Sequence, residues 1–195
     1  MRIKQGTDRS RGTAARRDQI VAATIAVLAR RGYAATSYDA ICEQAGLSSK
    51  RLISYHFTTK DELLAEVLRR VTTDAAERMR PAIEAEPRPD GKLAAYIRSN
   101  IQFIAEHPEH VRAVQQIVYA AVPTEEADSA VARLAVLFED GQRAGAFRAF
   151  DPTLMAYTVR AAIDASAGRL IAGADPTHYA EELTELFHQA TRAAR

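Results

Sequence analysis

The helical spacing of apolar residues is the feature that most limits how this chain can fold. From Ile20 the apolar positions Ala23, Val27 and Leu28 follow the three-and-four spacing of an amphipathic helix. No segment shows sustained alternation of apolar and polar residues with β-branched enrichment, so no strand is predicted. Further helical patterns open at Pro or Asp, in Pro87–Gly91, His107-Pro108, Pro123-Thr124, Asp151-Pro152 and Asp175-Pro176. The chain of 195 residues is therefore predicted to be all-α, with about nine helices.

Three short helices are predicted in the first 60 residues. The first ends at Gly32, because Arg30 and Arg31 complement the carbonyl end of a helix and glycine readily adopts a left-handed cap. Thr36 or Ser37 can cap the second helix. These signals predict two helices that meet at a sharp turn.

A second glycine separates the second and third helices. Gly46 interrupts the second helix, and Ser48 or Ser49 can cap a third that runs to Phe57. The sequence Thr59-Lys60-Asp61-Glu62 then forms a capping box for a long fourth helix. Three helices with a tight glycine-containing turn are typical of a DNA-binding helix-turn-helix.

The two parts of the chain carry opposite charge. Residues 1–60 hold 11 Lys or Arg against 4 Asp or Glu, a net charge of +7, whereas residues 61–195 hold 15 against 21, a net of −6. A basic segment joined to an acidic one indicates a head that binds a polyanion on a body that nucleic acid would repel. A chance distribution of charge is the alternative.

Composition narrows the class of protein further. With 47% hydrophobic and 26% charged residues the chain should fold, and its single cysteine, Cys42, allows no intramolecular disulfide. We expect Cys42 to be a core residue. No export signal and no membrane-spanning apolar run is recognised, so a cytoplasmic protein is expected.

Neither catalysis nor a cofactor is indicated by any motif. The sequence has no Gly-rich phosphate loop, nucleophile elbow or HExxH motif, so we expect no enzyme and no cofactor. His107 and His110 are too few ligands for a metal site, and none is predicted.

The basic segment resembles the tetracycline-repressor (TetR) family of transcription regulators. The resemblance is carried by Ile20–Tyr33, Thr36–Tyr38, Ile41–Lys50 and Tyr55–Leu64. It is close over residues 15–65, and beyond them the likeness is limited to the helical layout and to Gly145-Ala146-Phe147-Arg148. It implies a flexible basic arm over residues 1–14, a helix-turn-helix domain over 15–60 and a helical effector-binding and dimerisation domain over 61–195.

The third helix is the expected recognition helix. Lys50 and Arg51 are the candidates for contact with bases or phosphates, and a solvated basic face is the alternative. The chain departs from the family pattern at Arg51, Leu52 and Ser54, so the helix start is open by one residue. Six further residues are expected to position phosphates: Ser48, Ser49, Ser54, Tyr55, His56 and Lys60.

Two groups of residues keep alternative interpretations. Thr36, Ser37 and Tyr38 either cap or pack helices or contact a phosphate of the opposite strand. The arm, with Arg2, Lys4, Arg9, Arg11, Arg16 and Arg17, is expected to become ordered on DNA, to reach a minor groove or to serve as a solubilising tail.

An aromatic face with a few polar groups is expected to bind a largely apolar effector. Asn100 is the polar group of most interest, and ordinary core packing explains each position as well. The candidate ligand residues are Tyr96, Asn100, Phe103, Ile104, Tyr119, Phe138 and Tyr157.

The last two helices carry small residues that allow close helix approach. The resemblance implies that they pair with a second subunit in a four-helix bundle. These residues are Ala161, Ala162, Ala165, Ser166 and Gly168, beside Leu170, Leu183, Leu186 and Phe187. Arg160 and Asp164 are predicted to form an ion pair nearby.

The resulting hypothesis is a homodimeric repressor that leaves a near-palindromic DNA operator when a small molecule binds. The alternatives are a DNA-binding regulator whose body binds a protein partner or no effector and, less supported, an enzyme.

Overall fold

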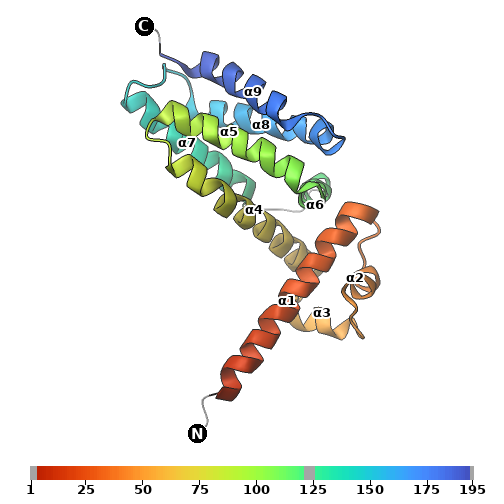
Figure 1. Ribbon diagram of the computed structural model, residues 1–195. Coiled ribbons are helices and arrows are strands. Elements are labelled where there is room, and N and C mark those ends of the chain that lie inside the picture. Colours follow the sequence, from red (N-terminus) through yellow and green to blue (C-terminus); the bar gives the residue numbers. More distant parts are fainter. Residues whose placement is uncertain (1–3, 121–125, 194–195) are drawn as a thin grey trace. The chain divides into compact units, whose positions relative to one another are not determined.

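The computed structural model describes residues 4–120 and 126–193, with side chains from residues 12 to 120 and from 129 to 193. Within these residues it contains nine helices and no strand, which confirms the predicted all-α class. The helices are α1 (Lys4–Arg31), α2 (Tyr38–Ala45), α3 (Arg51–His56), α4 (Lys60–Glu84), α5 (Pro89–Glu106), α6 (Pro108–Tyr119), α7 (Glu126–Arg143), α8 (Pro152–Ile171) and α9 (Pro176–Thr191) (Figure 1).

The chain forms two compact units. The first comprises residues up to 71 together with 109–123, and the second comprises 72–108 together with 124–195. The expected boundary at residue 60 is the start of α4, but the first three turns of α4 remain in the first unit because Leu63, Leu64 and Val67 are completely buried there. Helix α6 belongs to the first unit as well.

Helix α1 begins earlier than the sequence pattern indicates. Residues 4–14, expected as part of a flexible arm, form its first turns. No proline interrupts this segment, and its Arg, Ala, Lys and Gln residues favour helix. The side chains of Arg2, Lys4, Arg9 and Arg11 lie outside the described residues.

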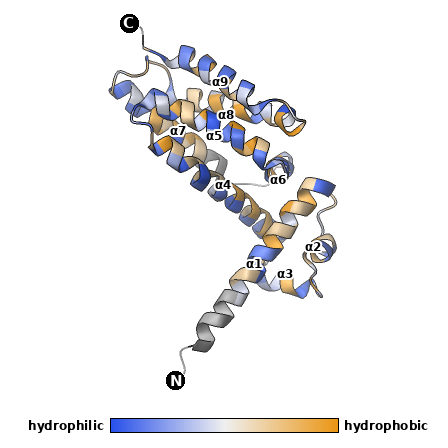
Figure 2. Ribbon diagram, viewed as in Figure 1, coloured by the Kyte–Doolittle hydropathy of each residue, from blue (hydrophilic) through white to orange (hydrophobic). Residues whose placement is uncertain are grey.

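The core of the first unit combines the apolar faces of α1, α2, α3 and α4. Figure 2 shows the apolar stretch of α1 ending in a hydrophilic last turn, which contains Arg30 and Arg31. Gly32 follows with a φ of 77°, so the predicted left-handed stop is confirmed. The completely buried residues of this core include Ile20, Leu28, Ile41, Ile53, Phe57, Leu63 and Leu64.

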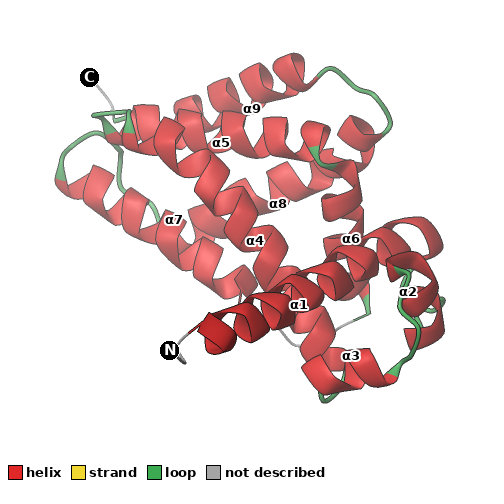
Figure 3. Ribbon diagram, turned by 60° about the horizontal axis from the view of Figure 1, so that its bottom comes forward, coloured by secondary structure: helices red, strands yellow, loops and turns green. Residues whose placement is uncertain are grey.

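The second unit is a helical bundle built around α5. Helix α5 packs against α7, α8 and α9, and α8 also packs against α7 and α9 (Figure 3). Asp151 and Asp175 accept hydrogen bonds from backbone N–H groups at the starts of α8 and α9, and each is followed by proline. These two helix starts agree with the sequence prediction.

An aromatic cluster closes one end of this bundle. Phe138 lies with its ring centroid 5.6 Å from that of Phe147 and 5.3 Å from that of Phe150. Phe147 belongs to the segment after α7, where an isolated antiparallel bridge joins it to Arg192. The Gly145–Arg148 segment therefore fastens the end of α7 to the end of α9.

Candidate functional site

The turn between α2 and α3 has helix-turn-helix geometry. Gly46 has a φ of 63° and ψ of 35°, a left-handed conformation that glycine adopts without strain. The N–H of the following residue, Leu47, donates to the carbonyl of Cys42 at 2.9 Å. The predicted interruption at Gly46 is thus confirmed, and it fixes the direction in which α3 leaves α2.

The residues before α2 divide between capping and packing. Ser37 Oγ accepts a hydrogen bond from the Ala40 N–H at 3.2 Å, which makes Ser37 the cap. Thr36 is only 2% exposed, and its hydroxyl donates to the Gly32 carbonyl at 2.8 Å. Thr36 therefore follows the packing alternative and does not lie on an exposed face.

Tyr38 and Cys42 are partly or fully covered on α2. Tyr38 is half-buried, and burial, with the nearby carboxylates of Glu62 and Asp61, raises its pKa. Cys42 is buried, as expected of a core residue, and burial is the main cause that raises the pKa of its thiol.

Helix α3 begins one residue later than expected. It runs from Arg51, and Ser49 Oγ accepts the Arg51 N–H at 3.2 Å. Ser48 is exposed beside this start. Of the two proposed caps, Ser49 makes this hydrogen bond, although the residue at the N-cap position itself is Lys50.

Helix α3 is anchored on one side and open on the other. Ile53 within the helix and Phe57 at its end are completely buried. Arg51, Ser54 and Tyr55 are exposed, with Tyr55 exposed by 77%. The structure therefore brings three of the expected DNA-contacting residues together on the solvent side of one short helix.

Two further candidates are engaged with aromatic rings. Lys60 Nζ lies 4.4 Å from the centre of the Tyr33 ring, a cation-π distance. His56 is half-buried, and its ring lies edge-on to Tyr55 with centroids 5.1 Å apart. Burial lowers the pKa of His56, and the charges of Arg17 and Arg16 lower it further.

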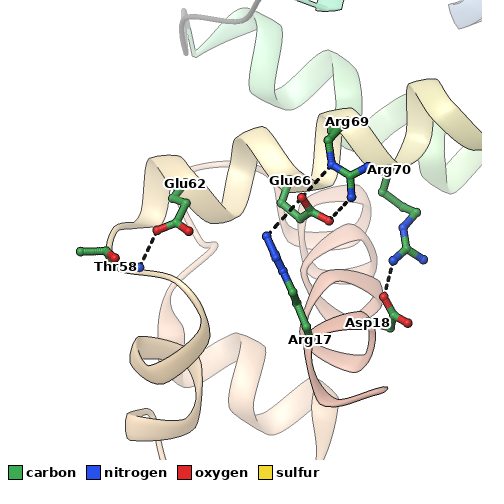
Figure 4. A network of polar contacts seen from close by, with 7 residues as sticks. All are labelled: Arg17, Asp18, Thr58, Glu62, Glu66, Arg69 and Arg70. Atoms are coloured by element: carbon green, nitrogen blue, oxygen red, sulfur yellow. Dashed lines mark hydrogen bonds and ion pairs between the residues drawn. The ribbon is translucent and has the colours of Figure 1, made fainter. Parts of the chain in front are cut away.

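The buried carboxylate of Glu66 joins α4 to α1 (Figure 4). Glu66 has a side chain exposed by only 10%, and Arg69 donates to it through Nε at 2.9 Å and Nη2 at 2.5 Å. Arg17 Nη2 lies 3.2 Å from the same carboxylate. Hydrogen bonding by Arg69, reinforced by nearby arginine charges, lowers the pKa of Glu66.

Arg17 extends this network to α3. Its guanidinium lies 4.6 Å from the centre of the Phe57 ring, and Arg70 forms a second ion pair between α4 and α1 with Asp18. Arg17 was expected in the arm, and Glu66 was not among the expected functional residues. The available signal was a charged residue on the apolar face of α4 beside Val67.

The start of α4 carries the predicted capping box. The Glu62 N–H donates to Thr59 Oγ1 at 3.1 Å, and the Glu62 carboxylate accepts the Thr58 N–H at 2.7 Å (Figure 4). The reciprocal pattern is confirmed, with the carboxylate reaching one residue further back than in the standard box.

Tyr96 and Asn100 meet Arg160 in the second unit. Asn100 is buried, its amide donates to the Tyr96 carbonyl at 2.8 Å, and its Oδ1 accepts from Arg160 at 3.0 Å. Arg160 also donates to the Tyr96 hydroxyl at 3.2 Å and to Asp164 at 2.7 Å, so the predicted Arg160–Asp164 pair is confirmed. The contact between Arg160 and Asn100 was not predicted from the sequence.

The remaining effector candidates do not gather around these residues. Ile104 and Phe138 are buried core residues, and Phe103 lies against His107 with ring centroids 4.7 Å apart. Tyr119, in the first unit, and Tyr157 are exposed by 78% and 52%. Helical spacing marked an apolar face but could not identify the neighbouring helix at each position.

A surface hollow of about 280 Å³ lies between α5 and α9. None of the seven expected effector residues lines it. Its lining is rich in charged and hydroxyl groups: Asp90, Gly91, Leu93, Ala94, Arg98, Thr184, Glu185, His188 and Thr191.

Apolar side chains are exposed on α8 and α9. Leu154 and Tyr157 on α8 are exposed by 66% and 52%, and Leu186 on α9 by 57%. The α8 face continues through exposed Ala161, Ala165 and Gly168, whereas Ser166 is buried. The exposed part of the predicted small-residue surface is therefore Ala161, Ala165 and Gly168. Ser166 is excluded, and Leu170 and Phe187, predicted beside it, are buried in the core.

Neither a metal-binding cluster nor a membrane-spanning helix occurs among the described residues. They contain no group of three or more His, Cys, Asp or Glu side chains placed to hold a metal ion. Among the same residues, every helix is too short or too polar to cross a bilayer.

Comparison with known proteins identifies a family match within the first unit. Residues 20–67 match the model of bacterial regulatory proteins of the tetR family. The chain is 34% identical over 88 residues to the HTH-type transcriptional regulator BetI of Paraburkholderia xenovorans, covering 44% of each chain. It is 30% identical over 108 residues to the HTH-type transcriptional activator FasR of Mycolicibacterium smegmatis, covering 55% of this chain and 49% of FasR. The matches span about half the length of these relatives or less.

Solved structures extend the likeness to the whole fold. A putative transcriptional regulator from Saccharomonospora viridis in complex with choline aligns with a TM-score of 0.76 at 20% identity, over 93% of this chain and 100% of that one. Chains described as TetR-family or TetR-like regulators also align over at least 91% of this chain. Residues 20–67 therefore match the TetR family of bacterial regulatory proteins, and the fold of the whole chain resembles that of solved TetR-family transcriptional regulators.

Proposed function

We propose that this chain is a homodimeric repressor that binds a near-palindromic operator and leaves it when a small molecule binds the second unit. The observation that carries the proposal is the exposed face of α3. Ile53 and Phe57 anchor this helix in the core, while Lys50, Arg51 and Tyr55 remain accessible. An anchored short helix with exposed cations and hydroxyls has the form of a major-groove reader.

The exposed face of α8 and α9 supports the proposed dimer. Leu154, Tyr157 and Leu186 are large apolar side chains left open to solvent, next to small residues on α8. A two-fold interface uses the same surface on both subunits, and small residues let two helices approach closely. A dimer would carry two recognition helices to two half-sites about one DNA turn apart.

The cluster of Arg160, Tyr96, Asn100 and Asp164, here the Arg160 cluster, supports effector binding by the second unit. Arg160 contacts Tyr96 and Asn100, two of the expected ligand residues. The choline complex reported for the Saccharomonospora viridis regulator favours a small molecule here as well. If the effector and the operator favour different arrangements of the dimer, each lowers the affinity for the other by the same factor. A cytoplasmic location remains part of this proposal.

One observation favours a second candidate, in which the body binds a protein partner or no effector. The expected aromatic residues are divided between the core, the surface and the Arg160 cluster, and none lines the hollow between α5 and α9. A metabolite screen that produces no thermal stabilisation and no release from the operator would select this candidate. Because FasR is named an activator, a reporter assay must decide the direction of control.

The test of DNA binding is the double substitution Lys50→Ala with Arg51→Ala. The matched control is Arg133→Ala with Arg143→Ala, which removes the same charge from exposed positions on α7. Fluorescence anisotropy with an operator selected from random DNA should show loss of binding for the first pair and retention for the control. Both variants should keep wild-type helicity and dimer mass.

Salt dependence adds an independent criterion. If about six to ten phosphates are neutralised, operator affinity should fall by about 10³ to 10⁵ between about 50 and 200 mM salt. Wild-type affinity of the Lys50→Ala, Arg51→Ala variant together with a weak salt dependence would refute the proposed interface.

A further inference from the structure

An acidic residue holds one of the expected DNA-contacting cations. Lys50 Nζ lies 2.8 Å from the carboxylate of Asp39, in the first turn of α2. The side chains are exposed by 57% and 73%, so the pair lies at the surface. It bridges the turn around Gly46 and joins the start of α2 to the start of α3.

The turn does not require this ion pair for its own stability. Gly46 and Leu47 donate backbone hydrogen bonds to the end of α2, and Ile41 and Ile53 bury completely on either side. Ion pairs between two exposed groups contribute little to folding. The main effect of Asp39 is therefore on Lys50. Its carboxylate fixes the position of the Lys50 ammonium and competes with any other anion for that ammonium.

A DNA phosphate must compete with this carboxylate for Lys50. Asp39 also repels phosphates, because it places a negative charge among the cations of the same surface. In a complex made only of phosphate contacts, Lys50 exchanges one anionic partner for another, so leaving Asp39 adds little binding free energy. At an operator, a base edge offers directional acceptors that can draw the ammonium away from Asp39.

We infer that Asp39 is a specificity-determining residue, which lowers the affinity for non-operator DNA more than the affinity for the operator by holding Lys50 away from phosphates. This inference rests on the proposed DNA-binding function. Asp39 would thus contribute to specificity although its own charge opposes DNA binding.

The test is Asp39→Asn, measured with the selected operator and with a scrambled duplex of equal length. Scrambled-duplex affinity should rise roughly three- to ten-fold, and the slope of its log affinity against log salt should steepen by about one unit. Operator affinity should change less, so the ratio of the two affinities falls.

Glu43→Gln is the matched control. Glu43 is also an exposed acid of α2, but its partner is Arg31 at the end of α1, 3.1 Å away. This variant changes the net charge equally and should leave the affinity ratio unchanged. In a Lys50→Ala background, Asp39→Asn should no longer change the ratio.

Three results would overturn the inference. An equal gain on both duplexes would reduce Asp39 to a general charge effect, and a loss of operator binding would mean that Asp39 supports recognition directly. A change in the ratio that persists without Lys50 would exclude the proposed route. If the wild-type protein binds no duplex, the proposed function fails and this role fails with it, a result distinct from the other three.

Discussion

The substitution Gly141→Ala should destabilise the second unit by overpacking. Gly141 is buried in α7, and a Cβ built on it would lie 2.2 and 2.4 Å from two ring atoms of Phe147 and 3.1 Å from Pro89 Cβ. Phe147 is only 4% exposed and packs against Phe138 and Phe150, so its ring has little room to move.

The expected magnitude follows from two opposing terms. Overpacking a core costs about 1 to 3 kcal/mol, whereas replacing glycine by alanine inside a helix gains up to about 1 kcal/mol. The Cβ contacts of 2.2 and 2.4 Å place the overpacking cost in the upper part of this range, at about 2 to 3 kcal/mol. After the gain of about 1 kcal/mol we expect a net loss of about 1 to 2 kcal/mol, or about 2 to 8 °C in Tm for a chain of this size. Thermal and urea unfolding followed by circular dichroism will measure it.

Two controls separate crowding from other effects. Gly12→Ala changes an exposed helical glycine with nothing within 4 Å of the new Cβ, and it should stabilise by about 0.5 to 1 kcal/mol. Phe147→Leu should recover part of the Gly141→Ala loss. The reasoning is refuted if Gly141→Ala is as stable as the wild type, or if the two substitutions at 141 and 147 are additive.

Three further predictions concern the first unit. Glu66→Gln should cost about 1 to 2 kcal/mol near neutral pH, a value reduced because Arg17 and Arg69 are 35% and 52% exposed. The fold lowers the pKa of Glu66 below its usual value of 4.5, so this stabilisation is fully present above pH 4.5 and is lost as the pH falls through the lowered pKa. Urea unfolding at several pH values will show whether the free energies of unfolding of the variant and the wild type converge in acid. The fold lowers the pKa of His56 from its usual value, and a nearby phosphate would raise it again, so binding would favour the protonated imidazole. Operator affinity should therefore increase as the pH falls from neutral, and this dependence should be lost in His56→Gln. Thr59→Ala should cost about 1 kcal/mol through loss of the α4 cap, whereas Thr59→Ser should not, and equal stability of all three proteins would contradict the capping role.

Local signals in the sequence predicted most helix boundaries. Gly32 and Gly46 end helices because their left-handed conformations depend on the backbone alone, and Asp151 and Asp175 start helices through hydrogen bonds two or three residues away. Such features need only a few neighbouring residues, so a single sequence contains the information that determines them.

Features that depend on distant contacts were not predicted. Arg17 and Glu66 are 49 positions apart and meet only because α1 packs on α4. Arg160 meets Asn100 across two helices for the same reason, although its pair with Asp164, one turn away, was predicted. Periodicity shows which face of a helix is apolar, but it does not show what covers that face.

The mass of the protein on its selected operator tests the central claim most directly. Analytical ultracentrifugation in low salt should show two chains bound to one duplex, with dissociation as salt is raised. A protein that remains monomeric at every concentration, or that binds no duplex even in low salt, would contradict the account.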